Sequence, residues 1–109
     1  MTGSSLAAFG RSNFNSEVLA HRGLVLVDFW SERCMPCKQL SRLLEQLSEE
    51  IPPGVRIGTV DADDNPSLME RFGVRALPTL LFFKDGTLVE TRTGVDRRQV
   101  LKKLVEKHA

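Results

Sequence analysis

Runs of apolar and β-branched residues along this chain indicate buried β-strands. Five strands are predicted, at residues 6–9, 24–30, 55–61, 79–83 and 88–93, the first of them a short edge strand. The run at residues 24–30 is the most apolar and is typical of a strand covered on both faces, as in the centre of a parallel sheet. Asp28 is its one polar residue. The turn at residues 84–87 contains Asp85-Gly86, which predicts that the last two strands form an antiparallel hairpin.

Apolar residues that recur every three or four positions predict helices between these strands. A short helix at residues 16–22 has Asn15 as its cap and ends at Gly23. A long helix covers residues 34–50 and stops at the Pro-Pro-Gly segment of residues 52–54. The stripe of this helix that faces the core comprises Cys37, Leu40, Leu43, Leu44, Leu47 and Ile51.

Two further helices carry their own start signals. The helix at residues 67–72 is preceded by Asn65 as cap and by Pro66, which suits a first helical turn. The last helix begins at Asp96, whose carboxylate forms a capping box with Gln99 three residues later. Its predicted buried stripe comprises Val100, Leu101, Leu104 and Val105.

The order of elements is therefore β-α-β-α-β-α-β-β-α, which predicts an α/β fold. Strand-helix-strand crossovers require a parallel core, to which the terminal hairpin is added. We expect a central mixed sheet of four to five strands with helices on both faces. A chain of 109 residues suits one domain, residues 1–109, in which residues 1–5 form a loose tail.

Composition and charge exclude several classes of function. Fifteen Lys and Arg against fourteen Asp and Glu leave a net charge of +1, so no overall field attracts nucleic acid or an anionic membrane. No apolar stretch approaches the roughly 18 residues that a membrane-spanning helix needs. The first nine residues lack the pattern of a secretory signal, so a cytoplasmic location is expected.

The chain's two cysteines, Cys34 and Cys37, stand where a strand is followed by the long helix. A bridge between them closes almost no loop, so it is not a structural staple. At a helix N-terminus, unsatisfied N–H groups and the helix dipole favour the thiolate and lower the pKa of Cys34 below the usual value of about 8.5. Cys37 lies one turn further on, shielded but able to attack a mixed disulfide at Cys34, and Pro36 stiffens the connecting turn. The pattern indicates a redox pair with Cys34 as nucleophile.

Other interpretations of these polar and sulfur-bearing residues stay open. The cysteines could form half of a zinc site in a metal-bridged dimer, or could simply pack as small apolar residues. Zinc takes four ligands, however, and His21 and His108 have no ligand-like spacing to the cysteines, so no metal is expected. Burying Asp28 would cost several kcal/mol if it were charged and would raise its pKa, unless it sits at a strand end that reaches solvent.

The motifs together resemble the thioredoxin family, from about Phe14 to the C-terminus and in the family's order and spacing. The segments that carry the resemblance are Val27-Asp28-Phe29-Trp30, Cys34-Met35-Pro36-Cys37-Lys38, Ala76-Leu77-Pro78-Thr79, Phe83-Lys84-Asp85-Gly86 and Gly94. The resemblance implies the thioredoxin fold and a dithiol/disulfide oxidoreductase that reduces protein disulfides. It further implies electron transport through a disulfide of the chain itself, without a bound cofactor, and recycling by an NADPH-dependent thioredoxin reductase. A monomer is expected.

The resemblance also implies roles for individual residues. Asp28 corresponds to the buried acid that takes the proton from the second cysteine, through water, when that thiol attacks. Leu77-Pro78 corresponds to a turn with a cis peptide bond, beside which an extended substrate pairs as an added strand. The expected docking face comprises Trp30, Arg33, Met35, Pro36, Ala76, Leu77, Pro78, Gly94 and Val95.

Three residues depart from the family pattern. Arg33 replaces a tryptophan before the first cysteine, which favours the Cys34 thiolate and more acidic targets. Met35 replaces the glycine between the cysteines and so alters the redox potential. Thr59 occupies the position of a buried lysine, so Asp28 is harder to ionise. These departures leave two alternatives to a general reductase, namely a client-specific redox protein and a binding module without turnover.

Overall fold

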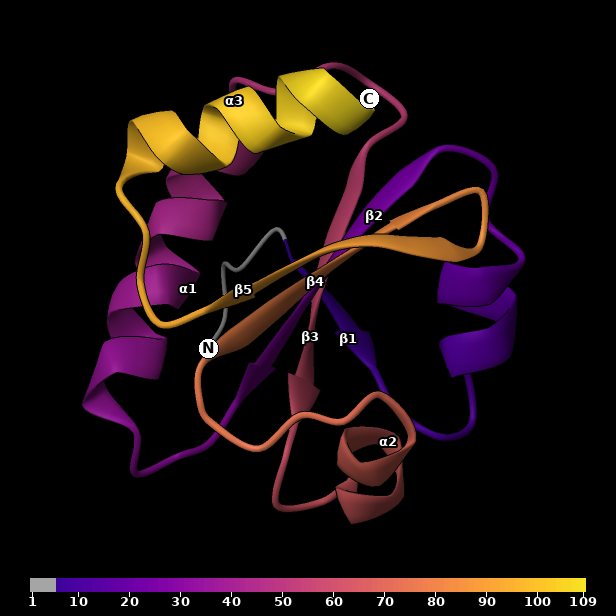
Figure 1. Ribbon diagram of the computed structural model, residues 1–109, viewed down its shortest axis with the longest axis vertical. Helices are drawn as coiled ribbons and strands as arrows, with labels where there is room; N and C mark the ends of the chain where they lie inside the picture. The colour runs from indigo at the N-terminus through magenta and orange to yellow at the C-terminus, as the bar shows by residue number, and fades with distance from the viewer. Residues whose placement is uncertain (1–5) are drawn as a thin grey trace.

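The computed structural model describes residues 6–109 (Figure 1). The predicted loose tail at residues 1–5 lies outside the described residues. The elements are β1 (Ala7–Phe9), η1 (Asn15–Leu19), β2 (Leu24–Trp30), α1 (Met35–Ser48), β3 (Arg56–Asp61), α2 (Pro66–Arg71), β4 (Thr79–Lys84), β5 (Thr87–Thr93) and α3 (Arg98–His108). Within these residues their order is the one that the apolar pattern predicts.

The five strands form one mixed sheet in the order β1-β3-β2-β4-β5. β1 and β2 lie parallel to β3, whereas β4 runs antiparallel to β2 and β5 antiparallel to β4. α1 and α3 cover one face, and η1 and α2 lie at the other (Figure 1). The predicted α/β architecture, with a mixed sheet between helices, is confirmed.

The direction of β4 corrects the expectation that each strand-helix-strand unit gives a parallel pair. Thr79, at the start of β4, lies opposite Phe29 near the end of β2, and Trp30 lies opposite Asp61 at the end of β3. The chain therefore leaves β3 and enters β4 at the same end of the sheet. α2 has six residues and is about 9 Å long, too short to carry the chain back along strands of about 20 Å. It lies across the end of the sheet in Figure 1.

The central strand β2 is buried from Leu24 to Phe29, as predicted for a strand covered on both faces. Val25, Val27 and Phe29 belong to the apolar cluster beneath η1 and α2. Leu24 and Leu26 belong to the cluster beneath α1 and α3. Since side chains alternate along a strand, Asp28 faces the same side as Leu26, toward α1.

The hairpin between β4 and β5 forms as predicted. Asp85 and Gly86 have φ values of 50° and 84°, the left-handed conformation that a two-residue hairpin turn of this kind requires at both positions. Asp85 also fixes the loop before β2, because its carboxylate accepts a hydrogen bond from the Gly23 N–H at 2.7 Å. This contact anchors the start of β2 to the hairpin.

Two predicted helix starts differ from the structure, those of η1 and α3, whereas the start of α2 is confirmed. η1 is a π-helical turn that contains Asn15 and ends at Leu19, because the chain already turns at Gly10, whose carbonyl accepts from the Phe14 N–H. Asn65 does precede α2, but its side chain donates to the Asp61 carbonyl instead of capping the helix. The predicted cap at Asn15 is therefore wrong, whereas Asn65 is the cap residue of α2 as predicted, without a capping hydrogen bond from its side chain.

The capping box of the last helix is also wrong. Asp96 pairs with Arg92 through two contacts of 2.9 and 3.0 Å, so α3 starts one residue later, with Arg97 at the cap position. Val100 is 37% exposed, and the fully buried members of the predicted stripe are Leu101 and Val105. The long helix α1 ends at Ser48, two residues before its predicted end.

Candidate active site

Cys34 and Cys37 form a disulfide at the start of α1, after the loop that follows β2. Cys34 is the cap residue of the helix, and its Sγ accepts a hydrogen bond from the Cys37 N–H at 3.1 Å. This N–H is one of the donors that a helix leaves unsatisfied in its first turn. In the reduced protein such a donor favours negative charge on the Cys34 sulfur.

The two sulfur-bearing side chains differ in their exposure. Cys37 is 1% exposed and points into the core from the stripe that also carries Leu40 and Leu44. Cys34 is half-buried and is flanked by Arg33 and Met35, both exposed. A protein substrate approaching this end of α1 therefore meets Cys34 first.

Asp28 is fully buried, so the alternative of a strand-end carboxylate that reaches solvent is wrong. Burial raises the pKa of Asp28 to about 7, and a hydrogen bond from Ser41 acts in the opposite direction. The Ser41 hydroxyl donates to Asp28 Oδ2 at 3.3 Å. Asp28 Oδ1 has no hydrogen-bond partner within residues 6–109. A carboxyl group with this pKa exchanges a proton near neutral pH.

Ser41 is a site residue that the sequence motifs did not indicate. It lies four residues after Cys37, so both side chains occupy one face of α1. A cavity of about 600 Å³ is lined by both of them, together with Leu6, Trp30, Lys38, Arg42, Glu45 and Thr59. Thr59 lies directly opposite Asp28 across the β2–β3 pair, which confirms that this position neighbours the buried acid. A polar residue one turn beyond Cys37 was the signal in the sequence.

The Leu77-Pro78 peptide bond is cis, as the resemblance implied. The Gly94 N–H donates to the Pro78 carbonyl at 2.9 Å, and the Thr79 hydroxyl donates to the Ala76 carbonyl at 2.6 Å. The first hydrogen bond joins two loops of the expected docking face, and the second lies within the loop before β4. Figure 1 shows both loops at the end of the sheet where α1 begins.

The expected docking residues vary in exposure. Met35 is 67% and Val95 38% exposed, whereas Pro78 is buried and Leu77 packs against the core. Trp30 is half-buried, belongs to neither apolar cluster and lines the cavity beside Cys37. The remaining members are exposed or half-buried, namely Arg33, Pro36, Ala76 and Gly94. The expected docking face thus combines exposed residues, such as Met35 and Val95, with the buried Pro78.

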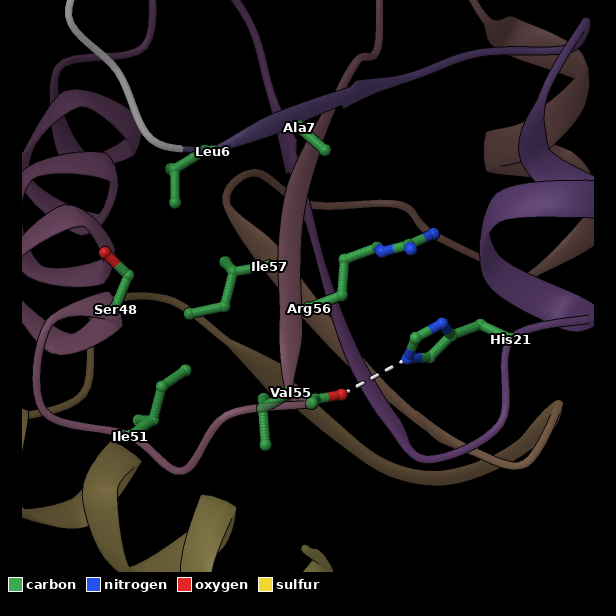
Figure 2. Close-up of a pocket in the computed structure, with 9 residues that line it drawn as sticks. Leu6, Ala7, His21, Ser48, Ile51, Val55, Arg56 and Ile57 are labelled. Atoms are coloured by element: carbon green, nitrogen blue, oxygen red, sulfur yellow. Dashed lines mark hydrogen bonds between the residues drawn. The ribbon is translucent and has the colours of Figure 1, made fainter.

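The histidines lie away from the disulfide. His21 Nε2 is 3.2 Å from the Gly54 carbonyl, at the edge of a second cavity of about 500 Å³ beside α1 and β3 (Figure 2). His108 pairs with Glu90 at 3.0 Å, between α3 and β5. No cluster of three or more potential metal ligands occurs within residues 6–109. Over the same residues, none of the helices has the length and apolarity needed to cross a membrane.

Comparison with known proteins places the chain in a family. The thioredoxin family model matches residues 5–107. Thioredoxin from Chlamydia muridarum is 45% identical over 98 residues, which cover 90% of this chain and 93% of the relative. Thioredoxin from Chlamydia caviae is 43% identical over 97 residues, with 89% and 92% covered. Thioredoxin from Bacillus subtilis is 42% identical over 86 residues, with 79% and 83% covered.

These matches agree with the mixed sheet, the disulfide at the start of α1 and the cis Leu77-Pro78 bond. Thioredoxins carry their redox group as a disulfide of the chain itself and use no bound cofactor. The chain belongs to the thioredoxin family and is a thiol-disulfide oxidoreductase, a disulfide reductase of the thioredoxin type.

Proposed function

We propose that Cys34 and Cys37 divide disulfide reduction between attack and resolution. The Cys34 thiolate attacks one sulfur of a protein disulfide, forms a mixed disulfide and releases the other sulfur as a thiolate. Cys37 then attacks Cys34, so the chain is left with the Cys34–Cys37 disulfide and the substrate with two thiols. The observation that carries this assignment is the Cys37 N–H bonded to the half-buried Cys34 sulfur at the helix start, with Cys37 itself buried.

Asp28 accepts the proton that Cys37 loses in the second step. Its burial in β2 and its pKa of about 7 suit a group that is partly ionised at neutral pH. The cavity lined by Cys37 and Ser41 has room for the water through which the proton passes. Asp28 is thus the base for resolution and not for the first attack.

Substrate docks on the exposed residues beside Cys34, namely Arg33 and Met35, and on the turn at Leu77-Pro78. The backbone of Leu77 at this turn pairs with an extended segment of the substrate. Exposed Met35 and Val95 supply apolar contact, and Arg33 favours acidic targets. The exposure of Arg33 and Met35 also supports the second candidate, a reductase specialised for one client.

Thioredoxins in general act on disulfide-containing proteins and are reduced again by a thioredoxin reductase. For this chain we propose the NADPH-dependent form of that enzyme, and electron transport from it to protein disulfides. One sheet spanning residues 7–93, with helices on both faces, supports a single domain, and we propose that this domain works as a monomer. A cytoplasmic location fits a dithiol that must be kept reduced.

The test is reduction of insulin disulfides by dithiothreitol, followed as turbidity, with the wild type, Cys34→Ser and Cys37→Ser. Only the wild type is expected to accelerate the reaction above the rate with dithiothreitol alone. Equal rates for the wild type and Cys34→Ser would overturn the assignment. Supplying electrons instead from NADPH and a bacterial thioredoxin reductase separates a general reductase, which turns over insulin, from a client-specific one, which does not.

Binding without turnover has its own signature. The Cys34→Ser/Cys37→Ser double variant would then hold a partner as tightly as the wild type, and insulin reduction would be absent in both. We expect the opposite pattern, in which loss of the thiols removes activity and the covalent contribution to capture.

A further inference from the structure

The carboxyl group of Asp28 has a single hydrogen-bond donor within residues 6–109. That donor is the Ser41 hydroxyl, 3.3 Å from Oδ2, and Oδ1 is buried without a partner. An unpartnered carboxylate oxygen in a buried site is costly, so the single donor matters for how the group is oriented. Ser41 reaches Asp28 from α1, thirteen residues away in the sequence.

The strands on either side of Asp28 offer no compensating charge. Its cross-strand neighbours are Thr59 on β3 and Leu80 on β4, both uncharged. The charged side chains that line the adjacent cavity all come from α1, namely Lys38, Arg42 and Glu45. The pKa of Asp28 responds to burial first and then to the Ser41 hydrogen bond, and to no charged neighbour.

Ser41 also lies next to the proton donor. Cys37 and Ser41 are one helical turn apart on α1 and line the same cavity. One turn of helix thus carries the thiol that loses the proton and the hydroxyl that contacts the proton acceptor. The position is occupied by a polar residue on a helix face that otherwise buries Leu40, Leu44 and Leu47.

We propose that Ser41 is a positioning residue for the resolving step, whose hydroxyl holds Oδ2 of Asp28 so that the free Oδ1 receives the proton from Cys37. This inference rests on the proposed proton-accepting role of Asp28. In the step, the Cys37 S–H bond breaks, its proton goes to Oδ1, and the Cys37 sulfur bonds to Cys34 while the substrate sulfur leaves as thiolate. Ser41 keeps donating to Oδ2 throughout and loses no proton itself.

The experiment measures the rate of resolution as a function of pH, after the reduced protein is mixed rapidly with a peptide disulfide. Ser41→Ala removes a donor to the ionised carboxylate, so the midpoint of the pH profile should rise by about one unit, and the rate near pH 7 should fall up to about tenfold. Ser41→Thr keeps the hydroxyl and should restore the wild-type profile. Ser48→Ala is the matched control, because the Ser48 hydroxyl on the same helix donates to the Glu45 carbonyl.

Asp28→Asn separates this inference from the role on which it rests. Slow resolution in Asp28→Asn, without the midpoint that Asp28 gives the wild-type profile and with no added effect of Ser41→Ala in that background, supports both. If Asp28→Asn is slow but Ser41→Ala follows the wild-type profile, the Ser41 inference is overturned while the role of Asp28 stands. If Asp28→Asn is as fast as the wild type, both fall. NMR titration of the Asp28 carboxyl carbon gives a second readout, and an unchanged midpoint in Ser41→Ala overturns the inference directly.

Discussion

Asp28 shows how one buried side chain can serve chemistry at the expense of stability. Burial raises its pKa to about 7 from a usual value of 3.8, so the folded protein binds a proton at this site more tightly than the unfolded chain. The contribution of Asp28 to stability is therefore full below about pH 4, decreases as the pH rises through 7, and is absent above that. The site is least favourable for folding where its carboxylate is most useful as a base.

This relation predicts the effect of Asp28→Asn on stability. The variant cannot ionise, so its stability relative to the wild type should increase between pH 4 and pH 8, by at most about 4 kcal/mol from the difference between the two pKa values. Urea unfolding at several pH values measures this. Asp64→Asn, which alters an exposed carboxylate, is the control and should show no such trend. A stability difference for Asp28→Asn that is constant with pH would contradict the assignment.

At the scale of a residue, the sequence reveals a polar residue in an apolar strand more readily than the residue that forms a hydrogen bond with it. Asp28 stands out because it interrupts an apolar run, and its burial is confirmed. Ser41 does not stand out, since a serine in an amphipathic helix is ordinary, and its contact depends on how α1 packs on β2. Thr59 could be placed beside Asp28 because the family pattern assigned that position, which the strand register confirms.

At the scale of helices and strands, the periodicity of apolar residues predicts which faces are buried. Competing side-chain contacts decide at which residue each element begins or ends. The stripe of α1 and the apolar run of β2 follow from burial alone, and both are confirmed. Asp96 fails as a cap because Arg92 on the neighbouring strand offers a bidentate ion pair. The cap outcome thus depends on a tertiary contact. The parallel direction expected for β4 is wrong for another reason: the helix predicted at residues 67–72 already had only six residues, too few to cross the sheet, and the order of elements alone does not take this length into account.

The pairing of β1 with β3 depends on a residue with no side chain. Gly58 is in β3 opposite Ala7, and a Cβ at this position would overlap the ring of Phe9. Gly58→Ala should therefore lower the free energy of unfolding by about 1–3 kcal/mol, as measured by urea denaturation. Adding Phe9→Leu should restore part of the loss.

A matched substitution distinguishes this overlap from a general cost of replacing glycine. Gly10 has its nearest potential contact, Asn65 Oδ1, at 3.4 Å, so Gly10→Ala should change stability little. Equal stability of Gly58→Ala and the wild type would show that the edge strand adjusts freely and that Phe9 does not fix it.

At the scale of the whole molecule, the disulfide and the proposed docking turn lie at the same end of the sheet. β2 and β3 end there, β4 begins there, and α1 starts from the loop that follows β2 (Figure 1). The antiparallel entry of β4, which the pattern of elements did not predict, is what brings Pro78 to this end. Its hydrogen bond with Gly94 then adds the loop after β5. The sheet thus fixes the disulfide and the proposed docking turn relative to one another.

Trapping the mixed disulfide shows which cysteine attacks the substrate, proposed to be Cys34, and which one resolves, proposed to be Cys37. Reduced Cys37→Ser is mixed with a disulfide-containing protein, and the products are identified by mass spectrometry without reductant. We predict a stable covalent adduct linked through Cys34, which dithiothreitol releases, whereas the wild type releases its substrate and forms the Cys34–Cys37 disulfide. An adduct through Cys37 in Cys34→Ser, with none through Cys34 in Cys37→Ser, would show instead that Cys37 is the attacking residue.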